Sequence, residues 1–255
     1  MALTRWDARV VARGFGVGTL VFALMLLVTA ATDEGGLGWA ERLSRTLPLA
    51  PACAAVGAWG ALAPARARGE ILALQAVGRS PAQVAAAAVA GGALVACLAA
   101  LALLSAPLAD GAAFFPRAVR PSAWAWSGAV FVDHARGLRV EADGTPVRMA
   151  PDATTALAAL PVHGVLAAAL AIASAGLALP LLVGLALARP GGHAAGRATS
   201  DGRADAAAVV ASAAAVVATI VLFQAAAVGR VPALAGGVPC LALLAFAIRR
   251  YRADA

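Results

Sequence analysis

Lysine is absent from this sequence of 255 residues, and charge of either sign is scarce. All 20 basic residues are arginine, and only 13% of the residues are charged while 62% are hydrophobic. Soluble domains carry about 25% charged residues. So little polar surface cannot cover a soluble protein of this size, and the composition therefore predicts a chain whose main solvent is a lipid bilayer.

The missing residues also exclude several classes of enzyme. An ABC-type ATPase reaches the β- and γ-phosphates of ATP with the lysine of a GxxxxGK[ST] loop, and a chain without lysine cannot form that loop. The HExxH zinc motif is absent, and the three histidines fall in three different segments. Each of the three cysteines lies in an apolar run, which is typical of small packing residues. We therefore predict no catalytic site, no metal site and no cofactor.

Long uncharged runs are the dominant feature that is present. A helix needs about 20 mostly apolar residues to cross the hydrocarbon core of a bilayer. Six segments run for 18 residues or more without Asp, Glu, Lys or Arg. A soluble amphipathic helix would interrupt such runs with polar residues every third or fourth position. We therefore expect an all-α polytopic membrane protein with six transmembrane helices, three on each side of a central insertion.

Proline and serine help to set the helix bounds. The expected helices are 14–32, 46–64, 81–107, 160–187, 206–228 and 233–250. Pro64 is expected to close the second helix, because an internal proline removes a backbone donor. Ser80-Pro81 supplies an N-cap and a first-turn proline for the third helix. The chain thus divides into 1–107, an insertion at 108–158, and 159–255.

Arginine also predicts the orientation, because cytoplasmic loops of membrane proteins carry an excess of positive charge. With the N-terminus in the cytoplasm, the cytoplasmic segments hold twelve arginines and the two short external loops hold three. Both termini are therefore expected in the cytoplasm. The net charge of +7 is a signal of membrane topology, so we predict no nucleic-acid partner.

The insertion at 108–158 has a different period from the helices. Residues 124–132 are aromatic and β-branched, and apolar and polar residues alternate in 138–141 and 147–149 around Asp143-Gly144. Asp-Gly between alternating segments is typical of a β-hairpin. We expect three or four short strands on the external side.

A short amphipathic helix is predicted at 66–80, between the second and third membrane helices. Ile71, Leu74 and Val77 recur at helical spacing with polar residues on the other face. Gly78 is placed to end the helix. Such a helix would lie on the cytoplasmic surface of the membrane.

Glu70 is the most informative residue of this segment, since no other acidic residue occurs between Glu41 and Asp110. One interpretation is structural, in which Glu70 caps the helix N-terminus or pairs with Arg66 or Arg68. The other is functional, in which the helix docks a cytoplasmic ATPase and Glu70 meets a basic residue there.

The segment 70–80 resembles the LptF/LptG (YjgP/YjgQ-type) family of lipopolysaccharide-export permeases. In that family a proline-bearing second helix precedes a coupling helix of the pattern E-[IL]-x-A-[LM]-x-[AS]-x-G-x-S. The sequence here reads Glu70-Ile71-Leu72-Ala73-Leu74-Gln75-Ala76-Val77-Gly78-Arg79-Ser80. Residues 126–131 are similar to the first strand of the family's periplasmic β domain, and 229–239 to the entry of its last helix.

The resemblance implies a permease subunit of the bacterial inner membrane, with a shortened periplasmic β domain. Its partners would be cytoplasmic ABC ATPase subunits, a second permease subunit in a homo- or heterodimer, and a lipid substrate. The implied ATPase-coupling residues are Glu70, Ile71, Leu74, Val77, Gly78 and Arg79.

Two further arginines are candidates for contact with the lipid. Arg42 and Arg45 lie at the mouth of the second helix, where they are expected either to bind lipid headgroup phosphates or to snorkel to the membrane interface. Two alternative functions stay open for the whole chain. One is a non-transporting mechanotransmission protein or adaptor similar to FtsX and MacB, which usually have four membrane helices. The other is a degenerate permease paralogue.

Overall fold

The computed structural model describes residues 4–32, 38–105, 125–127, 130–133, 138–148, 163–189 and 198–255. The helices are α1 (Arg5–Ala31), α2 (Trp39–Thr46), α3 (Ala50–Ala67), α4 (Glu70–Ala76), α5 (Pro81–Leu104), α6 (Gly164–Ala188), α7 (Ala198–Ala227) and α8 (Val238–Ala253), with 3-10 turns η1 (Leu47–Leu49) and η4 (Ala233–Gly237). Six helical segments in this part of the chain are long and apolar enough to cross a membrane. The expected membrane-protein class is confirmed at that level.

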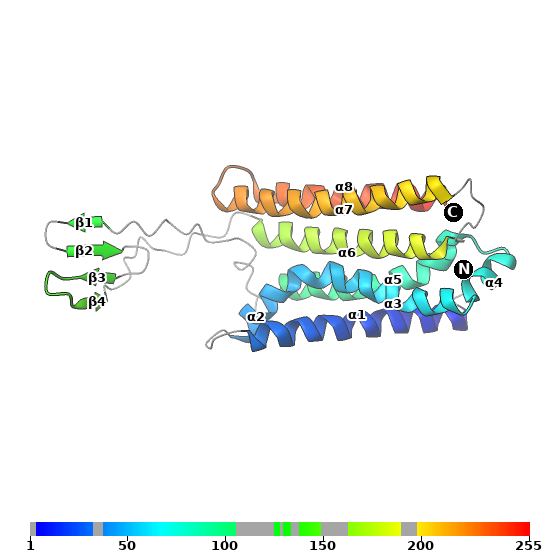
Figure 1. Ribbon diagram of the computed structural model, residues 1–255, viewed down its shortest axis with the longest axis horizontal. Helices are drawn as coiled ribbons and strands as arrows, with labels where there is room; N and C mark the ends of the chain where they lie inside the picture. The colour runs from blue at the N-terminus through cyan, green and yellow to red at the C-terminus, as the bar shows by residue number, and fades with distance from the viewer. Residues whose placement is uncertain are drawn as a thin grey trace.

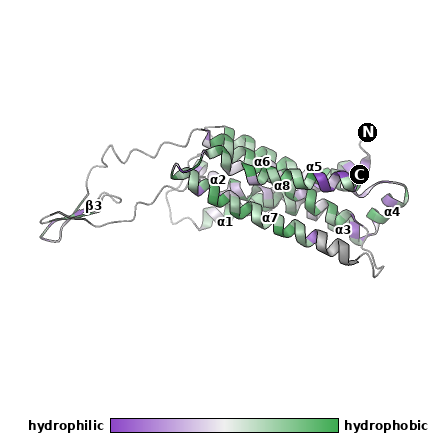
Figure 2. Ribbon diagram, turned by 90° about the horizontal axis from the view of Figure 1, so that it is seen from above, coloured by the Kyte–Doolittle hydropathy of each residue, from purple (hydrophilic) through white to green (hydrophobic). Residues whose placement is uncertain are grey.

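The long helices form one elongated bundle with two different ends (Figure 1). Both chain termini and α4 lie at one end, and α2 lies at the other. The hydrophobic colour follows the length of the helices in Figure 2, whereas hydrophilic residues gather near the termini and α4. The β-strands lie beyond the end that carries α2.

Small residues allow the central helices to pack closely. The alanines Ala54, Ala58, Ala88 and Ala178 have no measurable exposure. A Cβ on Gly57 of α3 would collide with the backbone of Gly14 in α1. Membrane helices typically approach one another through small residues of this kind. As a result α3, α5 and α6 form the interior, with α1 packed on α3 and α5, and α8 packed on α6.

The second membrane segment differs from the prediction at both ends. It begins with α2, which occupies residues predicted to form a loop, and passes through η1 with Pro48 into α3. Pro64 does not end the helix, which continues to Ala67. Pro64 removes one backbone hydrogen bond within α3, but membrane helices tolerate internal proline because neighbouring groups can satisfy the carbonyl that it leaves.

The first helix was predicted to begin at residue 14, but α1 begins at Arg5, because Thr4 and Asp7 form a capping box ahead of the apolar run. The bounds of the third helix follow the sequence more closely. Ser80 caps α5 through a capping box with Gln83, as Ser80-Pro81 predicts. The helix predicted at 206–228 begins earlier, at Ala198. The prediction treated this stretch as a polar linker, but it leads directly into the apolar run at 206–227, and a helix that has formed extends at the gain of one backbone hydrogen bond per added residue. The predicted bounds of the insertion, 108 and 158, lie outside the described residues.

The described strands of the insertion form one four-stranded antiparallel sheet in the order β1-β2-β3-β4. The strands are β1 (Ala125–Ser127), β2 (Val130–Asp133), β3 (Leu138–Val140) and β4 (Pro146–Arg148). The predicted hairpin at Asp143-Gly144 is confirmed. Gly144 has a φ of +83°, and Asp143 accepts hydrogen bonds from the backbone and hydroxyl of Thr145. These bonds hold the pKa of Asp143 below its ordinary value.

Candidate coupling site

The segment between α3 and α5 folds as a single short helix bounded by two glycines. Gly69 precedes α4 with a φ of +73°, and Gly78 follows it with a φ of +93°. Glycine adopts these left-handed conformations without a Cβ penalty. The helix itself is shorter than the predicted 66–80, because Arg66 and Ala67 still belong to α3.

Gly78 ends α4 in the way that the sequence indicates. Its N–H donates to the carbonyl oxygen of Gln75 at 2.9 Å, and the N–H of Arg79 donates to that of Leu74 at 3.1 Å. Paired bonds of this kind satisfy the last carbonyls of a helix whose chain turns through a left-handed residue. The turn at Gly78 therefore fixes the position of Arg79 relative to α4.

The apolar residues of this segment do not share one face. Ile71 is 3% exposed in the bundle core, and Leu74 is partly buried against the same core. Val77, predicted on that face, is 86% exposed, and Leu72 is 59% exposed. The prediction was wrong for Val77 because α4 ends at Ala76, so that Val77 lies in the turn. Leu72 and Val77 thus leave an exposed apolar surface outside the long helices.

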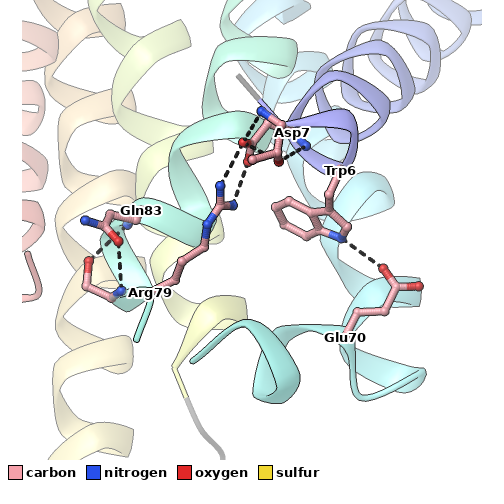
Figure 3. A network of polar contacts seen from close by, with 7 residues as sticks. Trp6, Asp7, Glu70, Arg79 and Gln83 are labelled. Carbon is pink, nitrogen blue, oxygen red and sulfur yellow. Dashed lines mark hydrogen bonds and ion pairs between the residues drawn. The ribbon is translucent and has the colours of Figure 1, made fainter. Parts of the chain in front are cut away.

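Both carboxylate oxygens of Glu70 have partners within the chain (Figure 3). Arg68 donates to Oε1 at 2.6 Å, which confirms one of the predicted structural pairs. The indole N–H of Trp6, in the first turn of α1, donates to Oε2 at 3.0 Å. The hydrogen bonds from Arg68 and from Trp6 lower the pKa of Glu70. Glu70 therefore joins α4 to α1.

Arg79 makes a second connection to α1. Its Nη1 and Nη2 donate to Oδ1 and Oδ2 of Asp7 at 2.8 and 2.9 Å, and its guanidinium lies 5.9 Å from the ring centre of Trp6. The two paired side chains are only 19% and 11% exposed. The hydrogen bonds that Arg79 donates to Asp7 raise the pKa of Arg79.

Asp7 also belongs to the N-terminal cap of α1. It accepts hydrogen bonds from the backbone and hydroxyl of Thr4, while the side chain of Thr4 accepts from the backbone of Asp7. This capping box fixes the first turn of the helix. Sequence reasoning missed the roles of Trp6 and Asp7, although the Thr-x-x-Asp pattern at residues 4–7 signals a helix start.

Two further side chains connect this segment to the end of α6. The Nε2 of Gln75 donates to the carbonyl oxygen of Ala188 at 2.5 Å. Arg66, the alternative partner predicted for Glu70, instead lies 3.3 and 3.4 Å from the carbonyl oxygens of Ala186 and Leu187. These donors satisfy carbonyls that the end of a helix leaves without partners. The segment therefore contacts α1 on one side and α6 on the other.

The last three helices are joined at the same end of the bundle. Arg189, which follows α6, pairs with Asp254 at 2.7 Å and with Asp205 of α7 at 3.5 Å. Arg250 of α8 pairs with Asp205 at 3.4 Å. The ends of α6, α7 and α8 thus form one cluster of ion pairs.

Arg42 and Arg45, predicted to contact lipid headgroups, lie in α2 at the opposite end of the bundle. The guanidinium of Arg42 lies 5.3 Å from the ring centre of Trp39. Arg45 pairs with Glu41 at 3.1 Å, and both side chains are exposed. The structure places both arginines far along the bundle from α4, so they form a separate site.

No other chemistry stands out in the part of the chain that the structure describes. It contains no group of three or more His, Cys, Asp or Glu residues that could hold a metal ion. Compared with known proteins, the chain matches no family model, and neither characterised proteins nor solved structures give a significant match. Functional conclusions therefore depend on the chain's own geometry.

Proposed function

We propose that the chain is the transmembrane permease subunit of an ABC-type exporter of a lipopolysaccharide-like lipid, and that α4 is its coupling element. The observation that carries the proposal is the combination of a fixed α4 and an exposed apolar surface. Contacts to Trp6, Asp7 and Ala188 hold this segment, while Leu72 and Val77 face outward. A coupling element needs both properties, because it must bind a moving partner and must not move independently of the bundle.

The surroundings of α4 support a cytoplasmic partner. The segment lies at the end of the bundle that holds both termini, and the arginine distribution predicts that this end faces the cytoplasm. Exposed apolar residues outside the bilayer are typical of protein contacts. The partner would be an ATPase with its own P-loop, since this chain has no lysine for one.

The opposite end of the bundle supports contact with lipid. The helix α2 is short and carries Trp39, Arg42 and Arg45. Aromatic and basic residues of this kind occupy the headgroup region of membranes, and arginine binds phosphate oxygens well. In the proposed exporter the lipid enters beside this helix, and a second permease subunit completes the path through the inner membrane.

A mechanotransmission protein or adaptor similar to FtsX and MacB is the second candidate. It is favoured by the size of the described sheet, whose strands are only three or four residues long. Such strands give little cover to an acyl chain, but they can still receive force from the bundle. Both candidates need the same ATPase contact, and they differ in whether lipid is moved.

The first experiment tests the ATPase contact. The tagged chain is purified from its native membranes, and its partners are identified by mass spectrometry and assayed for ATP hydrolysis. We expect a co-purified protein with a GxxxxGK[ST] loop, lost in Leu72→Glu and Val77→Glu and retained in the control Ala253→Glu, which changes an exposed residue of α8. Equal retention by all three variants contradicts the proposal.

The second experiment separates the two candidates. The purified complex is reconstituted in vesicles that contain fluorescent lipid A and fluorescent phosphatidylglycerol, and extraction of each lipid is followed with and without ATP. An exporter extracts at least one of them in an ATP-dependent manner. ATP hydrolysis without extraction of either lipid favours the mechanotransmission alternative.

A further inference from the structure

Two consecutive residues of α1 hold both ends of the coupling segment. Trp6 contacts Glu70, the first residue of α4. Asp7 contacts Arg79, which follows the turn at Gly78. Figure 3 shows the two contacts side by side on the first turn of α1. Through these two contacts, a displacement of α4 pulls or pushes on the first turn of α1.

We propose that the Asp7–Arg79 ion pair is the joint that transmits the motion of α4 to α1. This inference rests on the proposed function, because it assumes that an ATPase moves α4. The two parallel bonds of Arg79 fix the direction of the guanidinium as well as its distance from Asp7. Both side chains are largely buried, so water does not readily replace either partner.

The packing of α1 indicates which part of the helix is held in place when α4 moves and which part is displaced. Its four buried residues, Asp7, Val10, Gly14 and Gly18, all lie in the first half of a helix that the structure describes throughout. A Cβ on Gly18 would press on Val95 of α5 and on the backbone of Cys53 in α3. Close backbone contact at these glycines makes this part of α1 the tightest point of the helix.

Beyond Gly18 the helix is less buried, although Phe22 packs against the core and α2 contacts α1. Leu20, Leu24, Leu27 and Val28 are between 49% and 63% exposed. Only 11% of the most apolar window of α1 is buried, compared with 67% for α6. The helix therefore acts as a lever, with input at Asp7, a pivot at Gly14–Gly18 and an outer arm that is largely exposed. The same input applied to α6 would disrupt much more packing.

The experiment measures movement of that outer arm. Cys53, Cys97 and Cys240 are replaced by alanine, and spin labels are placed at two exposed positions, Leu27 of α1 and Leu166 of α6. The distance between the labels is measured by double electron–electron resonance, in the complex with the co-purified ATPase, with and without a non-hydrolysable ATP analogue. In the otherwise native chain we expect the nucleotide to shift this distance.

Variants of the Asp7–Arg79 pair then distinguish the transmission of motion to α1 from the binding of the ATPase. Arg79→Gln and Asp7→Asn should abolish the nucleotide-dependent shift while ATPase binding is retained. Although Arg79 is among the implied coupling residues, its guanidinium is directed at Asp7 and both side chains are largely buried, so neither is presented to a partner beside Leu72 and Val77. The double variant should behave like each single one, since both remove the same interaction. Arg79→Lys keeps the positive charge but cannot donate two parallel hydrogen bonds to one carboxylate. It should therefore reduce the nucleotide-dependent change in the distance between the labels.

A control and three outcomes make the inference testable. Thr4→Ala removes the cap from α1 but leaves Asp7 paired with Arg79, and it should keep the full shift. A full shift in Arg79→Gln, or no shift in the otherwise native complex, overturns the inference and leaves the proposed function standing. Failure of the otherwise native chain to bind any ATPase overturns both.

Discussion

The indole N–H of Trp6 donates a 3.0 Å hydrogen bond to Oε2 of Glu70, a residue 64 positions later in the chain. This contact gives α4 a defined position against α1, and it involves the carboxylate that the family resemblance implies as an ATPase-coupling residue. Glu70 is therefore engaged within the chain in this structure, whereas Leu72 and Val77 remain exposed. The geometry favours an ATPase contact made mainly by these two apolar residues.

The Trp6–Glu70 contact should depend on pH. Because the folded-state pKa of Glu70 lies below its ordinary value of 4.5, the contact should be complete above that value and be lost as the pH falls through the lower folded-state pKa. In a variant with Trp6 as its one tryptophan, the indole fluorescence should change with a midpoint below pH 4.5. Glu70→Gln should show no such transition. A midpoint at or above the ordinary value would contradict the contact.

Close helix packing at Gly57 should make this position intolerant of side chains. Gly57→Ala places a methyl group against the backbone of Gly14, and overpacking of this kind costs about 1–3 kcal/mol. We expect a lower midpoint of thermal unfolding in detergent. Gly16→Ala is the matched control, because a Cβ at Gly16 meets nothing within 4 Å. Equal stability of the two variants would show that α1 and α3 are not packed in this way.

The ion pairs of Arg189 should hold the ends of α6, α7 and α8 together. Arg189→Gln breaks the contacts to Asp254 and Asp205, in which the Arg189 side chain is 19% exposed. The free energy of unfolding should fall by about 1–3 kcal/mol, a value between those of exposed and buried ion pairs. Hydrogen exchange measured by mass spectrometry should increase in the last turns of α8. The exposed Arg252→Gln serves as the control, and similar exchange in both variants would argue against the cluster.

The two ends of the bundle should face opposite sides of the membrane. In a background without native cysteines, Ala73→Cys in α4 should react with a membrane-impermeant maleimide only from the cytoplasmic side. Gly144→Cys in the hairpin is strained by its positive φ, so Thr145→Cys is the better external probe, and it should react only from outside. Labelling of both positions from one side would refute the proposed topology.

The sequence predicts the membrane helices well because their signal is local. A run of apolar residues long enough to span the bilayer needs no knowledge of its neighbours, and the same holds for the Ser80 cap and the Asp143-Gly144 hairpin. The helix α2 was missed because it is short and holds three charged residues, so that all but its last residue lie outside the uncharged run that begins at Thr46. The cation–π contact between Arg42 and Trp39 was missed with it.

The coupling site was predictable only in part. The end of the helix at Gly78 and the pairing of Glu70 with Arg68 can both be predicted from residues that are close together in the sequence. By contrast, the partner of Arg79 lies 72 positions away, and no periodicity connects two residues on different helices. Val77 is exposed in the turn after α4, and helical spacing alone does not predict at which residue the helix ends.

Photocrosslinking at Val77 tests the central claim most directly. A benzoylphenylalanine in place of Val77, activated in native membranes, should crosslink the chain to a protein that carries a GxxxxGK[ST] loop and hydrolyses ATP. The same probe at Ala253, at the same end of the bundle, should not capture that protein. The account is contradicted if Val77 yields no nucleotide-hydrolysing partner, or if Ala253 captures it equally well.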